Sequence, residues 1–143
     1  MEILDKEDQV IDTKAKNLAI ASLLGYLVVG ITALVGLYGS WMSLSAFSST
    51  GAPDAVELSK GIGISNYAQW VMTLPLIIGV VCQNVSSSNT PFHKPQYWRF
   101  MMIISILSLI ASFIPLSFIL LIVAMISVII VSKNKSQYFS NEE

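Results

Sequence analysis

The chain has 143 residues, of which 54% are hydrophobic and only 12% are charged, whereas soluble domains usually carry about 25% charged residues. The charges are segregated, because residues 17–53, 61–92 and 100–132 contain no Asp, Glu, Lys or Arg. Each of these runs is long enough to cross the roughly 30 Å hydrocarbon core of a bilayer. The net charge of −1 excludes a basic nucleic-acid surface, and the single cysteine, Cys82, excludes an intramolecular disulfide and a cysteine-cluster metal site. The composition therefore predicts an all-α integral membrane protein.

The first apolar stretch, Asn17 to Phe47, carries small residues at helical spacing. At about 100° per residue, one helix face collects Ala21, Gly25, Thr32, Gly36, Ser40 and Ser43. Membrane helices associate by close backbone approach, so small residues mark a contact face. We predict a transmembrane helix over residues 17–39 that packs through this face against another helix of the chain or of a partner.

Polar segments flank this helix. Residues 1–16 hold five acids and three lysines and are predicted to form a cytoplasmic tail, either disordered or as a short interfacial helix. The loop over residues 48–66 is predicted to hold a short helix at the membrane surface, because Asp54 and Glu57 favour a helix N-terminus. Gly61 is predicted to end that short helix.

A second transmembrane helix is predicted over residues 67–83. Trp41 and Trp70 would anchor the outer ends of the first two helices, since tryptophan is enriched at the headgroup level. Pro75 lies within the second span and has no backbone N–H to donate. We expect Thr73 or a neighbouring helix to satisfy the carbonyl that Pro75 leaves free.

The last apolar run, residues 100–132, is interrupted only by Pro115. One helix over this run would be about 50 Å long, well beyond the thickness of the hydrocarbon core. We favour two transmembrane helices, residues 98–113 and 116–132, and keep one long kinked helix as the alternative. Trp98 and Arg99 would anchor the start of the third helix at the interface. Residues 133–143 are predicted to form a second polar cytoplasmic tail.

Four spans would place the N-terminal tail, the second loop and the C-terminal tail on one side of the membrane. That side carries seven of the eight basic residues: Lys6, Lys14, Lys16, Lys94, Arg99, Lys133 and Lys135. Lys60 alone lies on the other side. Basic residues concentrate in cytoplasmic loops, so both termini are predicted to be cytoplasmic in a multi-pass protein of the plasma membrane.

Reactive groups are sparse in this sequence. No Asp, Glu, Lys, Arg or His lies in the middle of a predicted span, which argues against a proton-coupled carrier. His93 is the single histidine and stands in a polar loop, so we expect a solvated side chain or a lipid-headgroup contact rather than a metal or haem ligand. We predict no catalytic, cofactor-binding or metal-binding residue, and enzyme function is the least favoured class.

Two sets of polar residues have alternative interpretations. Ser105, Ser108 and Ser112 form a stripe on the third predicted helix and, with Thr73, could line a polar path across the membrane. The favoured interpretation is close helix packing with weak interhelical hydrogen bonds. Gln69, Thr73 and Gln83 on the second predicted helix are expected to bond with one another, with the carbonyl that Pro75 leaves free or with a neighbouring helix. A binding pocket between helices is the alternative.

One short stretch resembles a known family. Gly36-Leu37-Tyr38-Gly39-Ser40, followed by Phe47 and by Gly61-Ile62-Gly63-Ile64-Ser65, is similar to the motifs that bracket the outer loop of stator-type proton channels of the TolQ, ExbB and MotA family. The pattern departs from the family at Ser40, which replaces a threonine, and the spacing to Phe47 is one residue short. The resemblance implies an ion-channel component.

Taken together, these features favour a non-enzymatic accessory subunit or scaffold of a membrane complex. Its expected partners are the lipid bilayer and either other membrane subunits or further copies of the chain, with no nucleic acid. Two alternatives remain: a channel or transporter component, and an immunity or sensor protein of a bacterial envelope that uses the outer loop.

Overall fold

The computed structural model describes residues 2–47, 54–87, 90–113 and 117–139, with side chains from Asp12 onward. Five α-helices cover most of these residues: α1 (Glu2–Ser45), α2 (Ala55–Val85), α3 (Pro95–Phe113), α4 (Phe118–Lys133) and α5 (Lys135–Phe139). The described residues contain no β-strand. The predicted all-α fold class is therefore confirmed.

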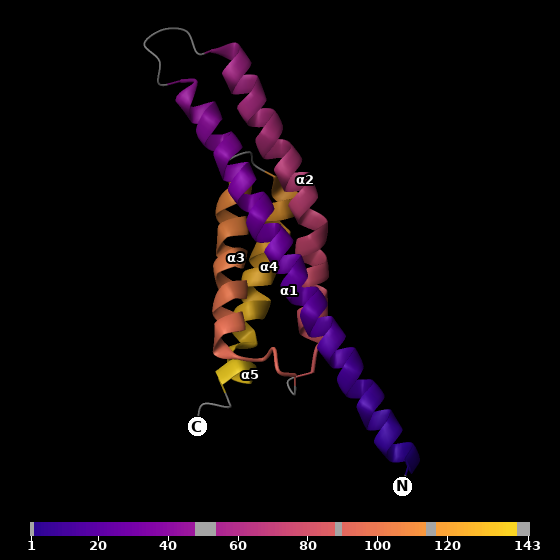
Figure 1. The fold of residues 1–143 in the computed structure, drawn as a ribbon. Helices are drawn as coiled ribbons and strands as arrows, with labels where there is room; N and C mark the ends of the chain where they lie inside the picture. Colours follow the sequence, from indigo (N-terminus) through magenta and orange to yellow (C-terminus); the bar gives the residue numbers. More distant parts are fainter. Residues whose placement is uncertain (1, 48–53, 88–89, 114–116, 140–143) are drawn as a thin grey trace.

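Two helical pairs of unequal length build the molecule (Figure 1). The long helices α1 and α2 run antiparallel and pack along each other. The shorter pair, α3 and α4, packs against one part of this hairpin, and α5 lies at the same end of the bundle as the start of α3. At the opposite end, α1 and α2 continue well past α3 and α4.

Three of these helices are long and apolar enough to cross a membrane, over Asp12–Ser45, Ala55–Val85 and Pro95–Phe113. At 1.5 Å per residue they extend about 51, 46 and 28 Å. The fourth apolar helix, α4, has 16 residues and extends only about 24 Å. The helices predicted over residues 98–113 and 116–132 correspond to two separate helices, α3 and α4. Pro115, where the sequence breaks the apolar run, lies outside the described residues.

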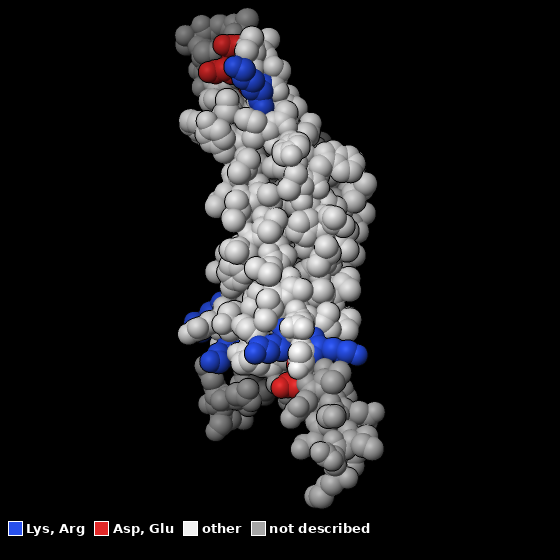
Figure 2. All heavy atoms as spheres, turned by 45° about the vertical axis from the view of Figure 1, so that its right-hand side comes forward, with Lys and Arg blue, Asp and Glu red and all other residues white. Residues whose placement is uncertain are grey.

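Charged side chains gather at the two ends of the molecule, and the surface between them is free of charge (Figure 2). At the end that holds α5, the described basic residues are Lys14, Lys16, Lys94, Arg99, Lys133 and Lys135. At the other end, the start of α2 carries Asp54, Glu57 and Lys60. The part of this uncharged surface that α1 to α4 build together suits the interior of a bilayer.

The prediction of a separate short surface helix between the first two spans was wrong. Asp54 does cap a helix, since its carboxylate accepts hydrogen bonds from the backbone nitrogens of Val56 at 2.9 Å and Glu57 at 3.3 Å. That helix is α2 itself, which continues through Gly61 to Val85 without a break. Gly61 does not end the helix because it serves a packing contact with α1.

The segment before the first predicted span is also helical. The helix α1 begins at Glu2 and includes the polar residues up to Lys16, so the first span and this segment form one continuous element. In Figure 1 this part of α1 projects beyond α3 and α4. The helical alternative for residues 2–16 therefore describes the structure, although not as a separate interfacial helix.

The core lies where α1, α2, α3 and α4 meet. Its largest fully buried side chains come from different helices: Tyr26 and Val29 from α1, Met72 and Leu76 from α2, Met101 from α3, and Leu120 and Val131 from α4. Each side chain fills space against the others, which excludes water and lipid from the interior. The buried polar residues at the α5 end border this apolar core.

Candidate functional site

The predicted helix-packing face of α1 lies mostly against α2. A Cβ atom built on Gly25 would lie 2.8 Å from a backbone oxygen of α2, and one built on Gly36 would lie 3.3 Å from Ala68 Cβ. Ser40 Oγ lies 3.2 Å from Ser65 Oγ. At these positions the chain makes the small-residue contact with its own second helix.

The other residues of this face are placed less uniformly. Ala21 and Thr32 are half-buried, and the Thr32 hydroxyl donates 2.8 Å to a carbonyl of the preceding turn of α1. Ser43 Oγ donates to the Gly39 carbonyl at 3.0 Å and also contacts Gly61 of α2. The two backbones therefore also approach closely at Gly39 and Gly61. Neither glycine was among the residues of the predicted packing face.

The four hydroxyls considered for a polar path do not join into one. Ser105, Ser108 and Ser112 are buried on one face of α3. Ser108 and Ser112 donate to carbonyls of their own helix at 2.8 and 2.6 Å. Thr73 lies on α2 and donates to the Gln69 carbonyl at 2.7 Å. Of the four, only Ser105 hydrogen-bonds with a side chain of another helix.

Thr73, one of the two expected partners for the carbonyl that Pro75 leaves free, is not its partner. Pro75 removes the usual donor to the Val71 carbonyl, four residues earlier, but the Thr73 hydroxyl bonds to Gln69 instead. The Gln69 side chain does reach a neighbouring helix, because its Nε2 atom donates to the Ala111 carbonyl of α3 at 3.2 Å. This bond holds the far end of α3 at the level of Gln69 on α2.

The predicted interface anchors differ in exposure. Trp41 and Trp70 are exposed, by 64% and 76%. Trp98 is half-buried, its indole nitrogen donates to the Val131 carbonyl at 2.8 Å, and Lys135 Nζ lies 5.6 Å from its ring centroid. Trp98 thereby joins α3 to α4 and α5, while Arg99 beside it is exposed.

The strongest candidate site is a buried hydrogen-bonded chain near the α5 end. Tyr26 of α1 donates to Gln83 Oε1 of α2 at 3.0 Å, and its hydroxyl lies 3.0 Å from Ser127 Oγ of α4. Ser127 lies 2.7 Å from Ser105 Oγ of α3. Since the Tyr26 proton goes to Gln83, Ser127 donates to Tyr26, and Ser105 in turn donates to Ser127. One polar chain therefore connects all four long helices.

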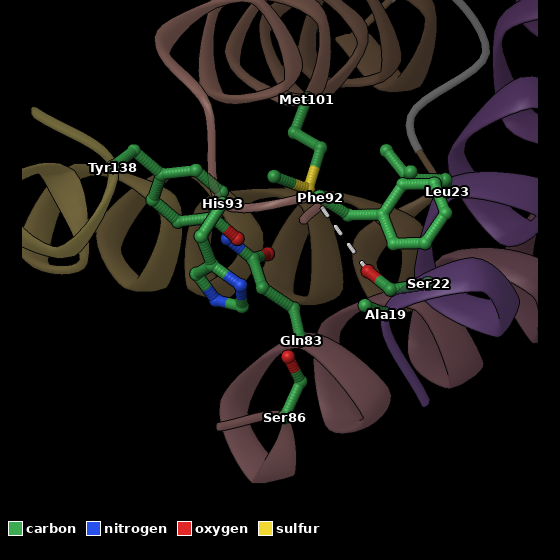
Figure 3. A pocket seen from close by; sticks show the side chains of 9 residues that line it. All are labelled: Ala19, Ser22, Leu23, Gln83, Ser86, Phe92, His93, Met101 and Tyr138. Atoms are coloured by element: carbon green, nitrogen blue, oxygen red, sulfur yellow. Dashed lines mark hydrogen bonds between the residues drawn. The ribbon is translucent and has the colours of Figure 1, made fainter. Parts of the chain in front are cut away.

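A small cavity adjoins the Gln83 end of this chain (Figure 3). Its walls come from α1, α2, α3, α5 and the segment before α3: Ala19, Ser22, Leu23, Gln83, Ser86, Phe92, His93, Met101 and Tyr138. Ser22 Oγ donates to the Gly79 carbonyl at 2.9 Å and lies 3.9 Å from the Met101 sulfur. The cavity is polar on one side and apolar on the other, and none of its walls carries a formal charge at neutral pH.

His93 closes this cavity rather than facing solvent, so the expectation of a solvated loop residue was wrong. Thr90 Oγ1 lies 2.6 Å from His93 Nδ1, and the imidazole stacks on the Tyr138 ring at a centroid distance of 4.6 Å. Burial lowers the pKa of His93 below its ordinary 6.5. Burial also raises the pKa of Tyr138 to about 12, despite the opposing effect of the nearby Gln83 amide.

Sequence reasoning missed Tyr26 and Tyr138 and misplaced His93. Tyr26 could have been found, because a phenol in the middle of a charge-free span needs a hydrogen-bond partner inside the protein. The stacking of His93 on Tyr138 joins residues far apart in the sequence, and no local pattern signals it. Comparison with protein-family models, curated proteins and solved structures returns no match for this chain.

The burial of His93 predicts that the packing of His93 under Tyr138 depends on pH. Because burial lowers the pKa of His93, the imidazole binds a proton more readily when it is exposed. The packed state is therefore fully stable above pH 6.5 and weakens as the pH falls through the lowered pKa. Tyr138 is the other titratable group among the cavity walls, and it stays neutral throughout this range. The protection factors of the α5 amides, which are exchange rates corrected for the intrinsic effect of pH, should fall between pH 7.5 and 5.

The control is His93→Phe, which keeps an aromatic ring for Tyr138 but cannot titrate. Its α5 amides should show a flat protection profile over the same pH range. An identical loss of protection in His93→Phe and in the unsubstituted chain would contradict the assignment to His93.

Proposed function

We propose that the chain is a four-span protein of the plasma membrane, with both termini in the cytoplasm, that acts as a non-enzymatic accessory subunit or scaffold of a membrane complex. The distribution of charge supports this topology. Basic side chains surround the α5 end, and Lys60 is the single described basic residue at the other end (Figure 2). Such asymmetry marks the cytoplasmic side of multi-pass proteins.

The accessory role rests on one observation, the outer hairpin. We define it as residues 38–47, which are the end of α1 and the turn after it, and residues 55–67 of α2. It lies beyond α3, whose end is fixed at Gln69. From Ala55 to Ser65, α2 extends about 15 Å beyond the level at which Asn66 lines a pocket with Ile119 of α4. Near the basic end, a bilayer about 30 Å thick would enclose α3 and α4 and leave much of the outer hairpin outside.

The outer hairpin nevertheless carries large apolar side chains on its surface. Leu44, Phe47 and Val56 are 62%, 61% and 60% exposed. Ile62 is exposed in the same part of α2. Large apolar side chains that are exposed outside the hydrocarbon often mark a protein contact. A neighbouring membrane protein that covers this surface would remove it from water.

The close packing between α1 and α2 makes the outer hairpin a suitable support for such a contact. Gly39 faces Gly61, and Ser40 bonds with Ser65, so the two backbones approach closely along this part. Close backbone packing leaves little room for the helices to shift. A preformed surface costs less ordering entropy on binding than a flexible loop would.

The test is association in mild detergent after truncation of the exposed side chains. The triple variant Leu44→Ala, Phe47→Ala, Val56→Ala should stay folded, yet its complex should weaken by about tenfold or more in native electrophoresis, because buried anchors dominate interface energy. The matched control is Ile122→Ala, Ile126→Ala, Ile129→Ala, three exposed residues of α4, which should leave migration unchanged.

Two outcomes would count against the proposal. One is an unsubstituted chain that migrates alone, and the other is a complex that survives the outer-hairpin variant. Coexpression of two differently tagged copies separates self-association from a contact with another protein.

A second candidate function, a channel or transporter component, is favoured by the run of buried hydroxyls on α3 that continues into Ser127, Tyr26 and Gln83. The accessory role is better supported. Ser108 and Ser112 bond to their own helix, and fully buried side chains such as Met72 and Leu120 fill the interior beside them.

A further inference from the structure

Two side chains that line the cavity beneath His93 carry buried nitrogen atoms with no hydrogen bond of good geometry among the described residues, Gln83 Nε2 and His93 Nε2. The Gln83 amide lies near enough to the Tyr138 phenol to oppose the rise in its pKa, but it forms no well-aligned bond there. Both side chains are almost fully buried, with 3% and 2% of their surface exposed. The nitrogens come from two different elements, α2 and the segment before α3. A buried polar atom left unpaired costs about 1–3 kcal/mol, so two such atoms beside one cavity indicate a ligand.

We propose that this cavity is a binding site for a single water molecule, held between Gln83 Nε2 and His93 Nε2. The volume supports one water, because the cavity measures about 10 Å³, and about 10–15 Å³ is needed for one. A larger organic ligand does not fit. An ion is also disfavoured, since no charged side chain lines the cavity and an unpaired buried charge is far more costly than a buried dipole.

The chemistry of the two nitrogens selects a molecule that can accept hydrogen bonds. The Gln83 amide nitrogen can only donate. When His93 Nδ1 accepts from the Thr90 hydroxyl, 2.6 Å away, Nε2 of the neutral ring carries the proton and also donates. Two donors cannot satisfy each other, but one water oxygen accepts from both. In the other tautomer His93 Nε2 is an acceptor, and the same water donates a hydrogen bond to it.

The cavity also offers acceptors for the two protons of the water. Ser22 Oγ already donates to the Gly79 carbonyl and keeps lone pairs free to accept, and Ser86 also lines the cavity. Buried waters typically make about three hydrogen bonds, and this site offers that number. The bound water would extend the Ser105–Ser127–Tyr26–Gln83 chain to His93, and so couple the four long helices to the segment that Tyr138 covers.

The experiment exploits the fact that His93 is the single histidine. The full chain, purified without a polyhistidine tag and labelled with ¹⁵N-histidine, gives one imidazole signal set in nanodiscs. At pH 7.5 we expect a neutral ring and magnetisation transfer between the imidazole and a long-lived water. A resolved imidazole with no transfer from water, or a ring that is charged at this pH, would overturn the proposal.

A substitution tests the second contact. Gln83→Met keeps a side chain of similar length but removes the donor, so water in the site should exchange about tenfold faster. The matched control is Gln69→Met, which removes the other buried glutamine of α2 at the far end of the bundle and should leave the imidazole signals unchanged. Equal effects of the two substitutions would show that Gln83 does not hold the water.

Discussion

Gly61→Ala should strongly destabilise the protein, although it adds only one methyl group. The new Cβ atom would lie 2.6 Å from the Gly39 carbonyl oxygen and 2.6 Å from the Ser43 backbone nitrogen. Both are backbone atoms of α1, so they cannot turn aside as a side-chain end could, and the helices must separate. We expect a loss of about 2–3 kcal/mol, measured by equilibrium unfolding in micelles with circular dichroism.

The matched control lies two residues further along the same helix. A Cβ atom on Gly63 would meet nothing within 4 Å, so Gly63→Ala carries the gain in helix propensity with no clash. It should stabilise the protein by about 0.5–1 kcal/mol. Equal effects of the two substitutions would mean that α1 and α2 do not approach closely at Gly61.

Tyr26→Phe is the second substitution with a large expected effect. Tyr26 is fully buried, and the loss of its hydroxyl removes one 3.0 Å bond to Gln83 Oε1 and another to Ser127 Oγ. The Gln83 oxygen would then stay buried without its donor, which should cost about 2 kcal/mol. Tyr67→Phe, at an exposed position of α2, should leave the unfolding curve unchanged in the same assay.

A double-mutant cycle sharpens this test. Adding Gln83→Leu to Tyr26→Phe removes the donor and the acceptor together, so the pair should cost clearly less than the sum of the single losses. Strict additivity would show that the hydroxyl and the amide do not bond to each other.

Much of the fold could be predicted from the positions of the three stretches without charged residues. The runs without charge locate the apolar parts of α1 to α4, because placing a charge in hydrocarbon is costly. The boundary between the first loop and α2 could not be found in this way. Gly61 and Gly63 look like a helix end in sequence, but Gly61 packs on Gly39, and this tertiary contact outweighs the local preference for a break.

The candidate site was less accessible to sequence reasoning. Gly25 and Gly36 share one face by simple periodicity, so their placement against α2 follows from local spacing. The cavity depends on His93 folding under Tyr138, and the two residues are 45 positions apart in the chain. A histidine between Pro91 and Pro95 resembles any loop residue until α5 is placed above it.

The short length of α4 has a consequence for the surrounding lipid. A helix about 24 Å long does not match a hydrocarbon core of about 30 Å, whereas α1 and α2 exceed that thickness. Lipids beside α4 would therefore be compressed, and lipids beside the hairpin would not. Hydrophobic mismatch of this uneven kind costs fractions of a kcal/mol per Å. The same protein would accordingly prefer thinner membranes, in which the lipids beside α4 need less compression.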